Sequence, residues 1–342
     1  MKLDARRLAA ALAVLALLTT ACQGGNSEGP NANASGESPE PPERCLSGED
    51  LPSGTKAGRP AVAVKIENSP EARPQEGLEK ADLVYEEIVE GAVTRFMAIY
   101  HCGTSDKTGP VRSARFDDAN LATPFTKVLA YSGSNDIVEE ELRKRRMIAL
   151  DEDVAGEGLY RDPPGSTGVH SLFAHTEKLR RLASKSGADS PTAEPFLFGD
   201  VPSDAQDAKR VTLHFHPSST IAYRYKGDSW KRFEGGEPFM TAAGSQLGVT
   251  NVLVQEVRVE KFKGIVDSTG TASPDIYVKG KGRALLFRDG KVIKGTWTVK
   301  EPGKAPVFET NEGEVMTFAI GSIWIELVPS ARGVVKGSFS FK

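Results

Sequence analysis

The chain has 342 residues, with 46 Asp and Glu against 43 Lys and Arg, which gives a net charge of −3. The first 21 residues hold three basic side chains and one acidic one, so the remainder carries about −5. This balance argues against a nucleic-acid partner, because non-specific binding needs a basic surface that releases counterions, and against attraction to anionic lipids by bulk charge.

The length accommodates about two domains of ordinary size. Thirty-four Gly, 21 Pro and an aromatic content of 7% indicate many turns and a large share of β-structure. Hydrophobic residues make up 39% of the chain, and a polar N-terminal stretch dilutes that figure, so the rest can form real cores.

The N-terminus has the layout of a secretory leader. A basic region, MKLDARR, precedes the apolar run LAAALAVLALL, and the small-residue stretch TTAC ends in Cys22. A cysteine at this place is typical of a bacterial lipoprotein, in which signal peptide 1–21 is removed and the thiol receives lipid such as palmitate. Thr19 departs from the leucine that usually stands three residues before the cysteine. Plain secretion with cleavage near Ala21 is the alternative.

Residues 22–57 are predicted to be a disordered tether. The sequence QGGNSEGPNANASGESPEPPER contains almost no large apolar residue, so burial cannot offset the entropy lost on ordering. No later segment approaches membrane-spanning length, so the predicted membrane anchor is the lipid on Cys22. We therefore expect an extracytoplasmic protein, held at the outer face of the cytoplasmic membrane.

Cys45 and Cys102 remain when Cys22 carries lipid. An even pair in an oxidising compartment favours a disulfide that ties the end of the tether to the first domain, and two unpaired thiols are the alternative. Metal spacings such as CxxC are absent, and His214 and His216 have no recognisable third ligand, so no metal site is expected.

Residues 58–190 are predicted to form an α+β or α/β domain. The strand-like stretches are residues 59–69, 81–91, 94–102 and 127–134. Residues 135–150 read as a helix capped by Asn135, with acidic residues at its start and basic ones at its end. A second predicted helix follows a Ser171 cap and ends at Gly187.

Residues 191–208 are rich in Pro, Asp and Ser and are predicted to be a linker. From 209 to 342 the sequence is a series of strand-like stretches without a long helical period, which predicts a mainly antiparallel β domain. Asp289-Gly290, between RALLFR and KVIKGTW, indicates a hairpin, because a type I′ turn needs positive φ at both positions.

The stretch TGPVRSARFDDANL, Thr108–Leu121, places two arginines three residues apart. Arg112 and Arg115 would share one face of a helix, with Asp117 and Asp118 further round it. Outward-pointing arginines would bind a phosphate or carboxylate, because the guanidinium fork matches such groups at two points. The alternative is a surface helix whose arginines pair with its own aspartates.

Polar residues also lie at the ends of the predicted strands. Glu67 and Asn68 close the first strand, Glu86 and Glu87 lie in the second, and Arg95 begins the third. Period-two alternation puts Glu86 and Glu87 on opposite faces, so at most one easily enters a shared cleft. Converging carboxylates would permit acid–base hydrolysis, and a structural network of Glu–Arg pairs is the alternative.

Catalytic and cofactor motifs are missing from the sequence. There is no GxSxG, no GxxxxGK[ST] and no GxGxxG that opens a helix, so no cofactor is expected. His170 follows the loop RDPPGSTG, where residues often contact ligands, although a lone histidine also suits a structural hydrogen-bonding role.

Several stretches carry a resemblance to a known family. They are IENSPEARPQEGLEKADLVYEEIVEGAVTRFMAIY, GPVRSAR, YSGS, an RDP loop with a histidine before a helix, GKGRALLFRDGKVIKGTW and WIELVP. Together they resemble the YerB-like bacterial lipoproteins over about residues 60–340. The resemblance implies an unusual N-terminal α/β domain and a β-rich C-terminal domain on an envelope lipoprotein of undefined activity.

The resemblance also selects candidate site residues. The family's loop reads Pro-His-Asn, whereas this chain has Val169, His170 and Ser171, which puts in doubt any role that needs the Asn amide. The matching positions are the candidates for one polar cleft: Glu67, Asn68, Glu86, Glu87, Arg95, Arg112, Arg115 and His170.

The sequence thus favours a non-catalytic envelope lipoprotein that binds a cell-wall ligand or an envelope protein through this cleft. The alternative is a hydrolase of wall glycan or peptide, using one of Glu67, Glu86 or Glu87 with His170. That enzyme would hold its carboxylates about 5–10 Å apart across a groove. The sequence leaves open whether the chain is an enzyme, and the missing catalytic motifs favour binding.

Overall fold

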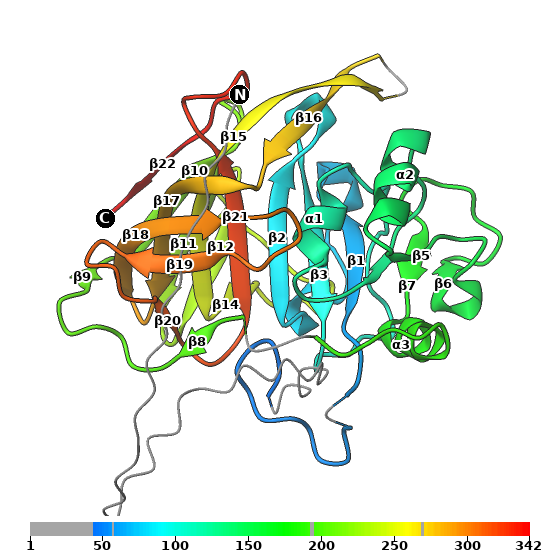
Figure 1. Cartoon of the computed structure of the whole chain (residues 1–342), viewed down its shortest axis with the longest axis horizontal. Helices are drawn as coiled ribbons and strands as arrows, with labels where there is room; N and C mark the ends of the chain where they lie inside the picture. The colour runs from blue at the N-terminus through cyan, green and yellow to red at the C-terminus, as the bar shows by residue number, and fades with distance from the viewer. Residues whose placement is uncertain (1–43, 57, 192–194, 268–269) are drawn as a thin grey trace, which may run out of the picture. The chain divides into compact units, whose positions relative to one another are not determined.

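One twelve-stranded sheet takes strands from both predicted domains (Figure 1). The computed structural model describes residues 44–56, 58–191, 195–267 and 270–342. The predicted signal peptide, Cys22 and the tether as far as residue 43 lie outside these residues. Along the sheet the strands follow the order β19-β18-β17-β15-β21-β2-β3-β1-β4-β5, while β16 pairs with β15 and β9 pairs with β18.

The first half of the chain supplies five strands of the large sheet and every α-helix found in the described residues. The strands are β1 (Val62–Glu67), β2 (Leu83–Ile88), β3 (Thr94–Tyr100), β4 (Val128–Ala130) and β5 (Ile148–Leu150). The helices are α1 (Asp118–Ala122), α2 (Asp136–Lys144) and α3 (Thr176–Lys185). A short separate sheet pairs β6 (Leu159–Arg161) with β7 (Leu172–Ala174).

The second half completes the large sheet and builds another sheet against it. Its strands in the large sheet are β9 (Gln206–Asp207), β15 (Asn251–Val266), β16 (Ala272–Tyr277), β17 (Gly280–Arg288), β18 (Lys291–Val299), β19 (Val307–Thr310) and β21 (Ile323–Pro329). The other sheet holds β10 (Arg210–His214), β11 (Ile221–Lys226), β12 (Ser229–Glu234), β13 (Glu237–Pro238), β14 (Gly248–Val249) and β22 (Ser338–Phe341). Strands predominate and helices are few, as the composition predicts.

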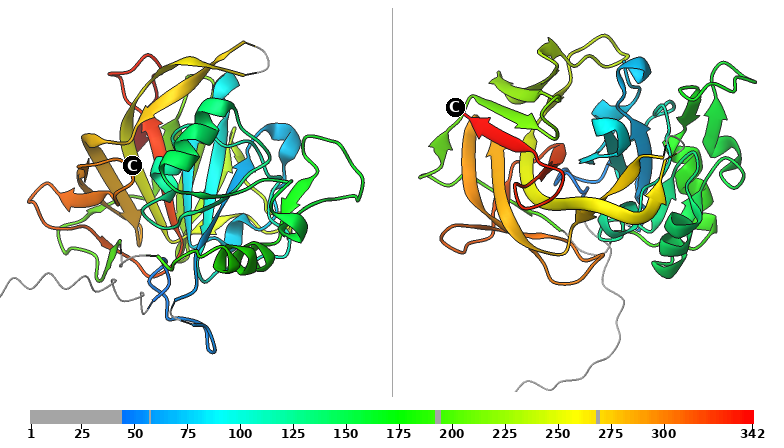
Figure 2. Two further views of the ribbon diagram at one scale, coloured as in Figure 1. Left: turned by 45° about the vertical axis from the view of Figure 1, so that its right-hand side comes forward. Right: turned by 90° about the horizontal axis from the view of Figure 1, so that it is seen from above.

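Aromatic side chains hold the two sheets together. The Phe287 ring, on β17, lies 5.6 Å edge-on from Trp230 on β12 and 5.6 Å from Phe341 on β22. Such edge-to-face pairs add to the free energy gained by burying the rings. Figure 2 shows the second sheet lying across the C-terminal strands of the large sheet.

The two halves meet where β2 pairs in parallel with β21, with Leu83 opposite Ile323 and Glu86 opposite Glu326. Both strands are buried along their whole length, and so are β1 and β3. Strands covered on both faces are continuously apolar, which explains runs such as Val62–Val64. The sheet therefore passes from one predicted domain into the other without a break.

The structure corrects the predicted helix boundaries. Asn135 caps α2, its side chain accepting a hydrogen bond from the Val138 N–H at 3.0 Å, but the helix ends at Lys144 rather than at residue 150. Residues 148–150 form β5 instead, because they pair in parallel with β4. Ser171 does not cap a helix, since β7 follows it and α3 begins only at Thr176.

The structure also shows the predicted turn at Asp289-Gly290 and most of the predicted linker, residues 191–208. Asp289 and Gly290 have φ of +50° and +68°, and they join β17 to β18 as the sequence predicts. Part of the predicted linker is packed rather than extended: Phe196 is buried, and β8 (Leu197–Phe198) pairs with β20 (Thr317–Phe318). Within the described residues, no helix is long and apolar enough to cross a bilayer.

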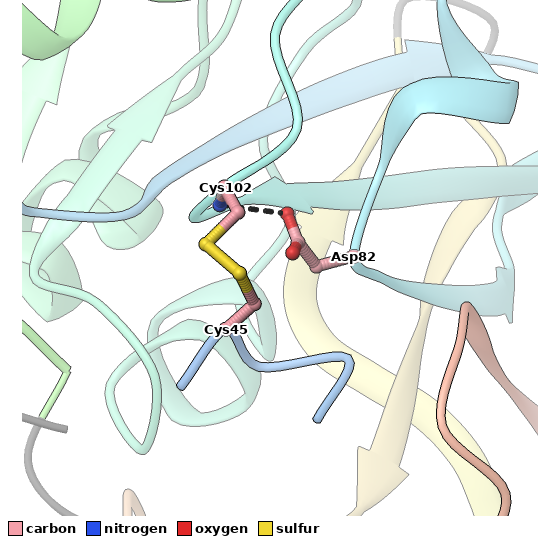
Figure 3. Close-up of side chains that lie close together, drawn as sticks. All are labelled: Cys45, Asp82 and Cys102. Atoms are coloured by element: carbon pink, nitrogen blue, oxygen red, sulfur yellow. Dashed lines mark hydrogen bonds between the residues drawn. A yellow bond between two sulfur atoms is a disulfide. The ribbon is translucent and has the colours of Figure 1, made fainter. Parts of the chain in front are cut away.

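A disulfide between Cys45 and Cys102 fastens the start of the folded body to the end of β3 (Figure 3). Cys45, Leu46 and Ser47 are buried, so this part of the predicted tether belongs to the folded body. The carboxylate of Asp82 lies beside the bridge and accepts hydrogen bonds from the backbone N–H groups of His101, Cys102 and Gly103 at 2.8–3.1 Å. Cys45, Asp82 and Cys102 bring three atoms of metal-ligand type within 4.8 Å of one another, but both sulfurs are used in the bridge.

We expect the double variant Cys45→Ala/Cys102→Ala to unfold at lower urea concentration than the parent. The two cysteines are 57 residues apart, and releasing a loop of that size should cost about 2–4 kcal/mol of the free energy of unfolding. Urea denaturation followed by circular dichroism measures the change, and the parent in reductant serves as control. An unchanged free energy of unfolding would show that the bridge does not stabilise the body.

Candidate functional site

The stretch that carries Arg112 and Arg115 is extended, not helical as expected. The Val111 N–H donates to the Leu172 carbonyl at 2.7 Å, and the Arg112 N–H donates to the Lys65 carbonyl at 2.9 Å. The segment is thus held between β1 and β7 by bonds to residues far away in the sequence. The short helix α1 begins only at Asp118, whose carboxylate accepts a hydrogen bond from the Arg115 N–H at 2.6 Å.

Five of the eight candidate residues line one cleft of about 800 Å³. They are Glu67, Arg95, Arg112, Arg115 and His170. The cleft lies at the ends of β1 and β3, and the β15–β16 hairpin of the second half contributes Ile265, Val266 and Ser273 to its lining. The segment 111–115 is extended, and both Arg112 and Arg115 belong to the lining of this cleft.

Two of the arginines in the cleft are paired with buried carboxylates. Arg112 forms an ion pair with Glu67. Arg115 donates two hydrogen bonds to the Glu90 carboxylate, at 2.9 Å from Nε and 2.5 Å from Nη2, and Ser273 donates to the same carboxylate. Burial raises the pKa of Glu90, but the hydrogen bonds from Arg115 and Ser273 outweigh burial and hold the pKa below its ordinary value.

Arg95 differs from its neighbours, because no carboxylate of the described residues lies within ion-pair distance of it. Only 6% of the residue is exposed, its Nη1 donates to the Ser113 carbonyl at 3.0 Å, and its Nε has no hydrogen-bond partner. Burial and the nearby Arg115 lower the pKa of the Arg95 guanidinium to about 10, although Glu67 and Glu90 act in the opposite direction. Arg95 therefore remains charged at neutral pH without a matched counter-charge.

His170 reaches the cleft from the loop before β7, as the sequence suggested. Its Nδ1 lies 3.9 Å from Oε2 of Glu67, and 35% of its side chain is exposed. Glu71 and Asp267 also line the cleft, so the total charge of the lining does not by itself favour an anion. An anion is favoured by the way the charges pair. Arg112 and Arg115 each have a carboxylate partner, whereas the buried Arg95 has none among the described residues.

Asn68 and Glu86 lie outside the cleft, in a buried network. The Glu86 carboxylate accepts two hydrogen bonds from Arg232, at 2.7 and 3.0 Å, and neither residue is exposed. The Asn68 amide donates to Thr94 Oγ1 at 2.8 Å and to Glu86 at 3.4 Å. Arg232 had no signal in the sequence, because it comes from β12 and meets Glu86 across 146 residues.

Glu87 points to the opposite face of β2, as strand alternation predicts, and is also outside the cleft. It pairs with Lys65, whose Nζ donates to Asp118 Oδ1 at 2.6 Å, and all three side chains are buried. Burial raises the pKa of Glu87 to about 7, although the Lys65 ammonium opposes the rise. The negative charge of Asp118, which shares the Lys65 ammonium group, adds to the effect of burial on the pKa of Glu87.

Glu90, Ser113 and Ser273 are site residues that were not among the candidates predicted from the sequence. Glu90 follows β2 in η3 (Glu90–Ala92), and its place at a strand end was the same signal that selected Glu67. Ser113 takes part through its carbonyl, which no sequence motif reveals. Ser273 lies 183 residues from Glu90, so only the fold brings them together.

Comparisons with known proteins agree on one family. Residues 46–189 match the family described as "Protein of unknown function (DUF3048) N-terminal domain", and residues 211–325 match its C-terminal domain. "Putative lipoprotein YerB" of Bacillus subtilis (strain 168) is 30% identical over 294 residues, which cover 82% of this chain and 85% of that protein. The crystal structure of YerB from Bacillus subtilis superposes with a TM-score of 0.70 at 26% identity, over 86% of this chain and 98% of that one.

The raised pKa of Glu87 makes a prediction about stability and pH. The folded protein keeps the Glu87 proton up to about pH 7, whereas the unfolded chain loses it near 4.5, so this residue's contribution to stability falls as the pH rises between those values. Glu87→Gln mimics the protonated form. Relative to the parent, we expect its free energy of unfolding to improve by about 3 kcal/mol across that window and to stay level above it.

Urea denaturation of parent and variant between pH 4.5 and 8 measures this difference. Glu140→Gln is the matched control, because Glu140 is half-exposed on α2 and should give a flat difference. If the difference in free energy of unfolding between Glu87→Gln and the parent did not change with pH, that result would contradict the raised pKa of Glu87.

Proposed function

The chain belongs to the YerB-like DUF3048 family, and we propose from that premise that it is a lipid-anchored envelope protein that binds an anionic ligand in the cleft. The ligand we propose is a carboxylate or phosphate group carried by a cell-wall component. The observation that carries the proposal is the buried Arg95 guanidinium, which forms no ion pair with a carboxylate in the described parts of the chain.

Anchoring is supported by the leader and by a relative. The basic, apolar and small-residue segments end at Cys22, and the Bacillus subtilis relative carries the word lipoprotein in its name. Lipid on Cys22 would hold the body at the outer face of the cytoplasmic membrane, and residues 23–43 would separate it from the bilayer. The Cys45–Cys102 bridge suits an oxidising compartment of this kind.

Binding is supported by the unfavourable free energy of burying the Arg95 guanidinium without an ion-pair partner among the described residues. A charge taken out of water is unfavourable unless it is paired, and proteins seldom keep such a charge without a use. Guanidinium groups match carboxylates and phosphates at two points, and hydrogen bonds to a charged partner are about twice as strong as neutral ones. An anion in the cleft would therefore supply what Arg95 lacks.

Other polar side chains in the cleft would orient the ligand. Ser134 and Asn135 lie at the turn after β4, and His170 faces them from the loop before β7 as part of the same lining. Glu67 and Glu90 keep Arg112 and Arg115 in place through their ion pairs. The arrangement resembles a preorganised binding site, in which few groups must move when the anion enters.

The hydrolase hypothesis loses two of its three carboxylates in this geometry. Glu86 and Glu87 are occupied by Arg232 and Lys65 in buried networks on either face of β2. Glu67 remains near His170, at 3.9 Å, but it is paired with Arg112. We therefore rank hydrolysis below binding.

Arg95→Met should separate a binding role from a structural one. We expect affinity for muropeptides released from purified cell wall to fall by about 10-fold or more, because charge-assisted hydrogen bonds of about 1.5–3 kcal/mol are lost. The melting temperature of the ligand-free variant should be unchanged or higher, since a buried unpaired charge is removed. Titration calorimetry and differential scanning calorimetry give the two values.

The control is Arg143→Met, which removes an exposed arginine from α2 and should change neither value. Inorganic phosphate as a competitor tells whether a phosphate or a carboxylate is read. A large fall in melting temperature for Arg95→Met with unchanged binding would make Arg95 a structural residue and remove the proposal.

Incubation with purified cell wall tests the alternative. We expect the parent to release no soluble fragments, because Glu67, the one candidate carboxylate of the hydrolase hypothesis that lines the cleft, is paired with Arg112. Fragment release by the parent that disappears in Glu67→Gln would instead establish the hydrolase, and Glu140→Gln is its control.

A further inference from the structure

A second groove, of about 960 Å³, opens where β15 parts from β17. Residues 252–255 of β15 pair with residues 284–287 of β17, whereas from Arg258 onward β15 pairs with β16. The first residues of β17, 280–283, therefore lose β15 as a neighbour. Figures 1 and 2 show β15 continuing past the large sheet together with β16. No residue lines both this groove and the cleft.

The groove is strongly basic although the chain is acidic overall. Five cationic side chains line it: Arg258, Lys279, Lys281, Arg283 and Arg332. Its carboxylate is Glu256, which pairs with Arg283 at 3.1 Å. All five cations are exposed, and the lining carries an excess of four positive charges in a chain of net charge −3.

Three of these cations form no ion pair with a carboxylate of the described residues: Lys279, Lys281 and Arg332. Arg258 forms a long ion pair, in which its Nε lies 3.8 Å from the Glu260 carboxylate. Ordinary protein surfaces intersperse charges of both signs, so a groove with one sign concentrates anions from solution. This local field differs from the bulk charge that the sequence shows.

Aromatic rings fix the positions of two guanidinium groups. The Arg258 guanidinium lies 3.8 Å from the centre of the Tyr277 ring, and that of Arg283 lies 4.4 Å from the centre of the Phe339 ring. Stacked guanidinium groups lose less conformational entropy when they bind a ligand, and their N–H groups remain available at the edge.

The floor of the groove is rigid backbone. Trp297 Nε1 donates to the Glu256 carbonyl at 2.9 Å, which bridges β18 to β15 beneath the gap. A Cβ on Gly282 would lie 2.4 Å from Trp297 Nε1 and 2.6 Å from the Glu256 carbonyl, so glycine is required for this close packing. The ring of Trp297 is 2% exposed and is not offered to a membrane.

We propose that this groove binds a linear polyanion, a chain of linked phosphate groups that lies along the basic walls. Lysines are point charges suited to phosphate, and the stacked arginines add two-point contacts. The volume is at the upper end of small-ligand sites, which leaves room for several repeating units. A bilayer would need protruding apolar side chains, and the groove's lining has none beyond the arginine-covered Tyr277.

The test uses the purified full-length mature protein and fluorescently labelled linear polyphosphate, with fluorescence anisotropy as the readout. In the double variant Lys279→Glu/Lys281→Glu we expect binding to weaken about 10-fold or more at low ionic strength. The slope of log affinity against log salt should fall by about one to two, because two phosphate contacts and their released counterions are lost. Both lysines are exposed and unpaired, so the melting temperature should not change.

Lys185→Glu/Lys226→Glu is the matched control, since it makes the same change in net charge at exposed lysines outside the groove. We expect this control to bind within about twofold of the parent. Equal weakening in the control would reduce the effect to bulk charge and overturn the proposal.

Two further arms identify the ligand class. Inorganic phosphate at the same phosphate concentration should compete poorly, and equal competition would show a single-phosphate site instead. Vesicles of phosphatidylcholine and phosphatidylglycerol should not bind through the groove, and a loss of vesicle binding alone in the double variant would assign the groove to the membrane. Arg95→Met should bind polyphosphate like the parent, so failure of the cleft proposal and failure of this one are separable.

Discussion

The buried guanidinium of Arg232 holds the second sheet to the line along which the two halves of the chain share the large sheet. It donates to both oxygens of Glu86 on β2, and it lies 3.6 Å from Glu326 on the neighbouring strand β21. Four aromatic rings, those of Phe96, Tyr223, Phe239 and Trp324, surround it at 5.0–5.5 Å. Removing one partner would leave an uncompensated buried charge at the place where β2 pairs in parallel with β21.

On each face of β2 one buried cation contacts more than one carboxylate. On one face Arg232 contacts Glu86, Glu234 and Glu326, and burial together with the Glu86 charge raises the pKa of Glu326 well above its ordinary value. On the other face Lys65 serves Glu87 and Asp118. In each group the pKa of one carboxyl group is raised, so that this group keeps its proton and stays neutral to a higher pH. The carboxylates of β2 are thereby committed to the fold, and no carboxylate of the described residues lies within ion-pair distance of Arg95 in the cleft.

Local signals predicted what depends on a few neighbouring residues. The Asp289-Gly290 turn, the Asn135 cap and the opposite faces of Glu86 and Glu87 all follow from short-range rules of backbone geometry. The spacing of Arg112 and Arg115 is also a short-range signal, and it fits a helix. The predicted helix was wrong because backbone hydrogen bonds to Lys65 and Leu172 hold this segment in an extended conformation. Such long-range bonds leave no periodic signal. The same is true of Arg232 and of Ser273, which are distant in sequence from the carboxylates they contact.

Net charge does not describe the two proposed anion sites, because both depend on local pairing. In the cleft a single guanidinium is 6% exposed and lacks a carboxylate, so its attraction for a ligand acts at short range in a region of low dielectric. In the groove the cations are exposed, and their field extends only about 8–10 Å at physiological salt. An acidic body of this kind repels polyanions at a distance and holds them only where basic walls face the ligand on several sides. Strength in the groove must therefore come from many weak contacts to one chain, whereas strength in the cleft comes from desolvating one strong contact.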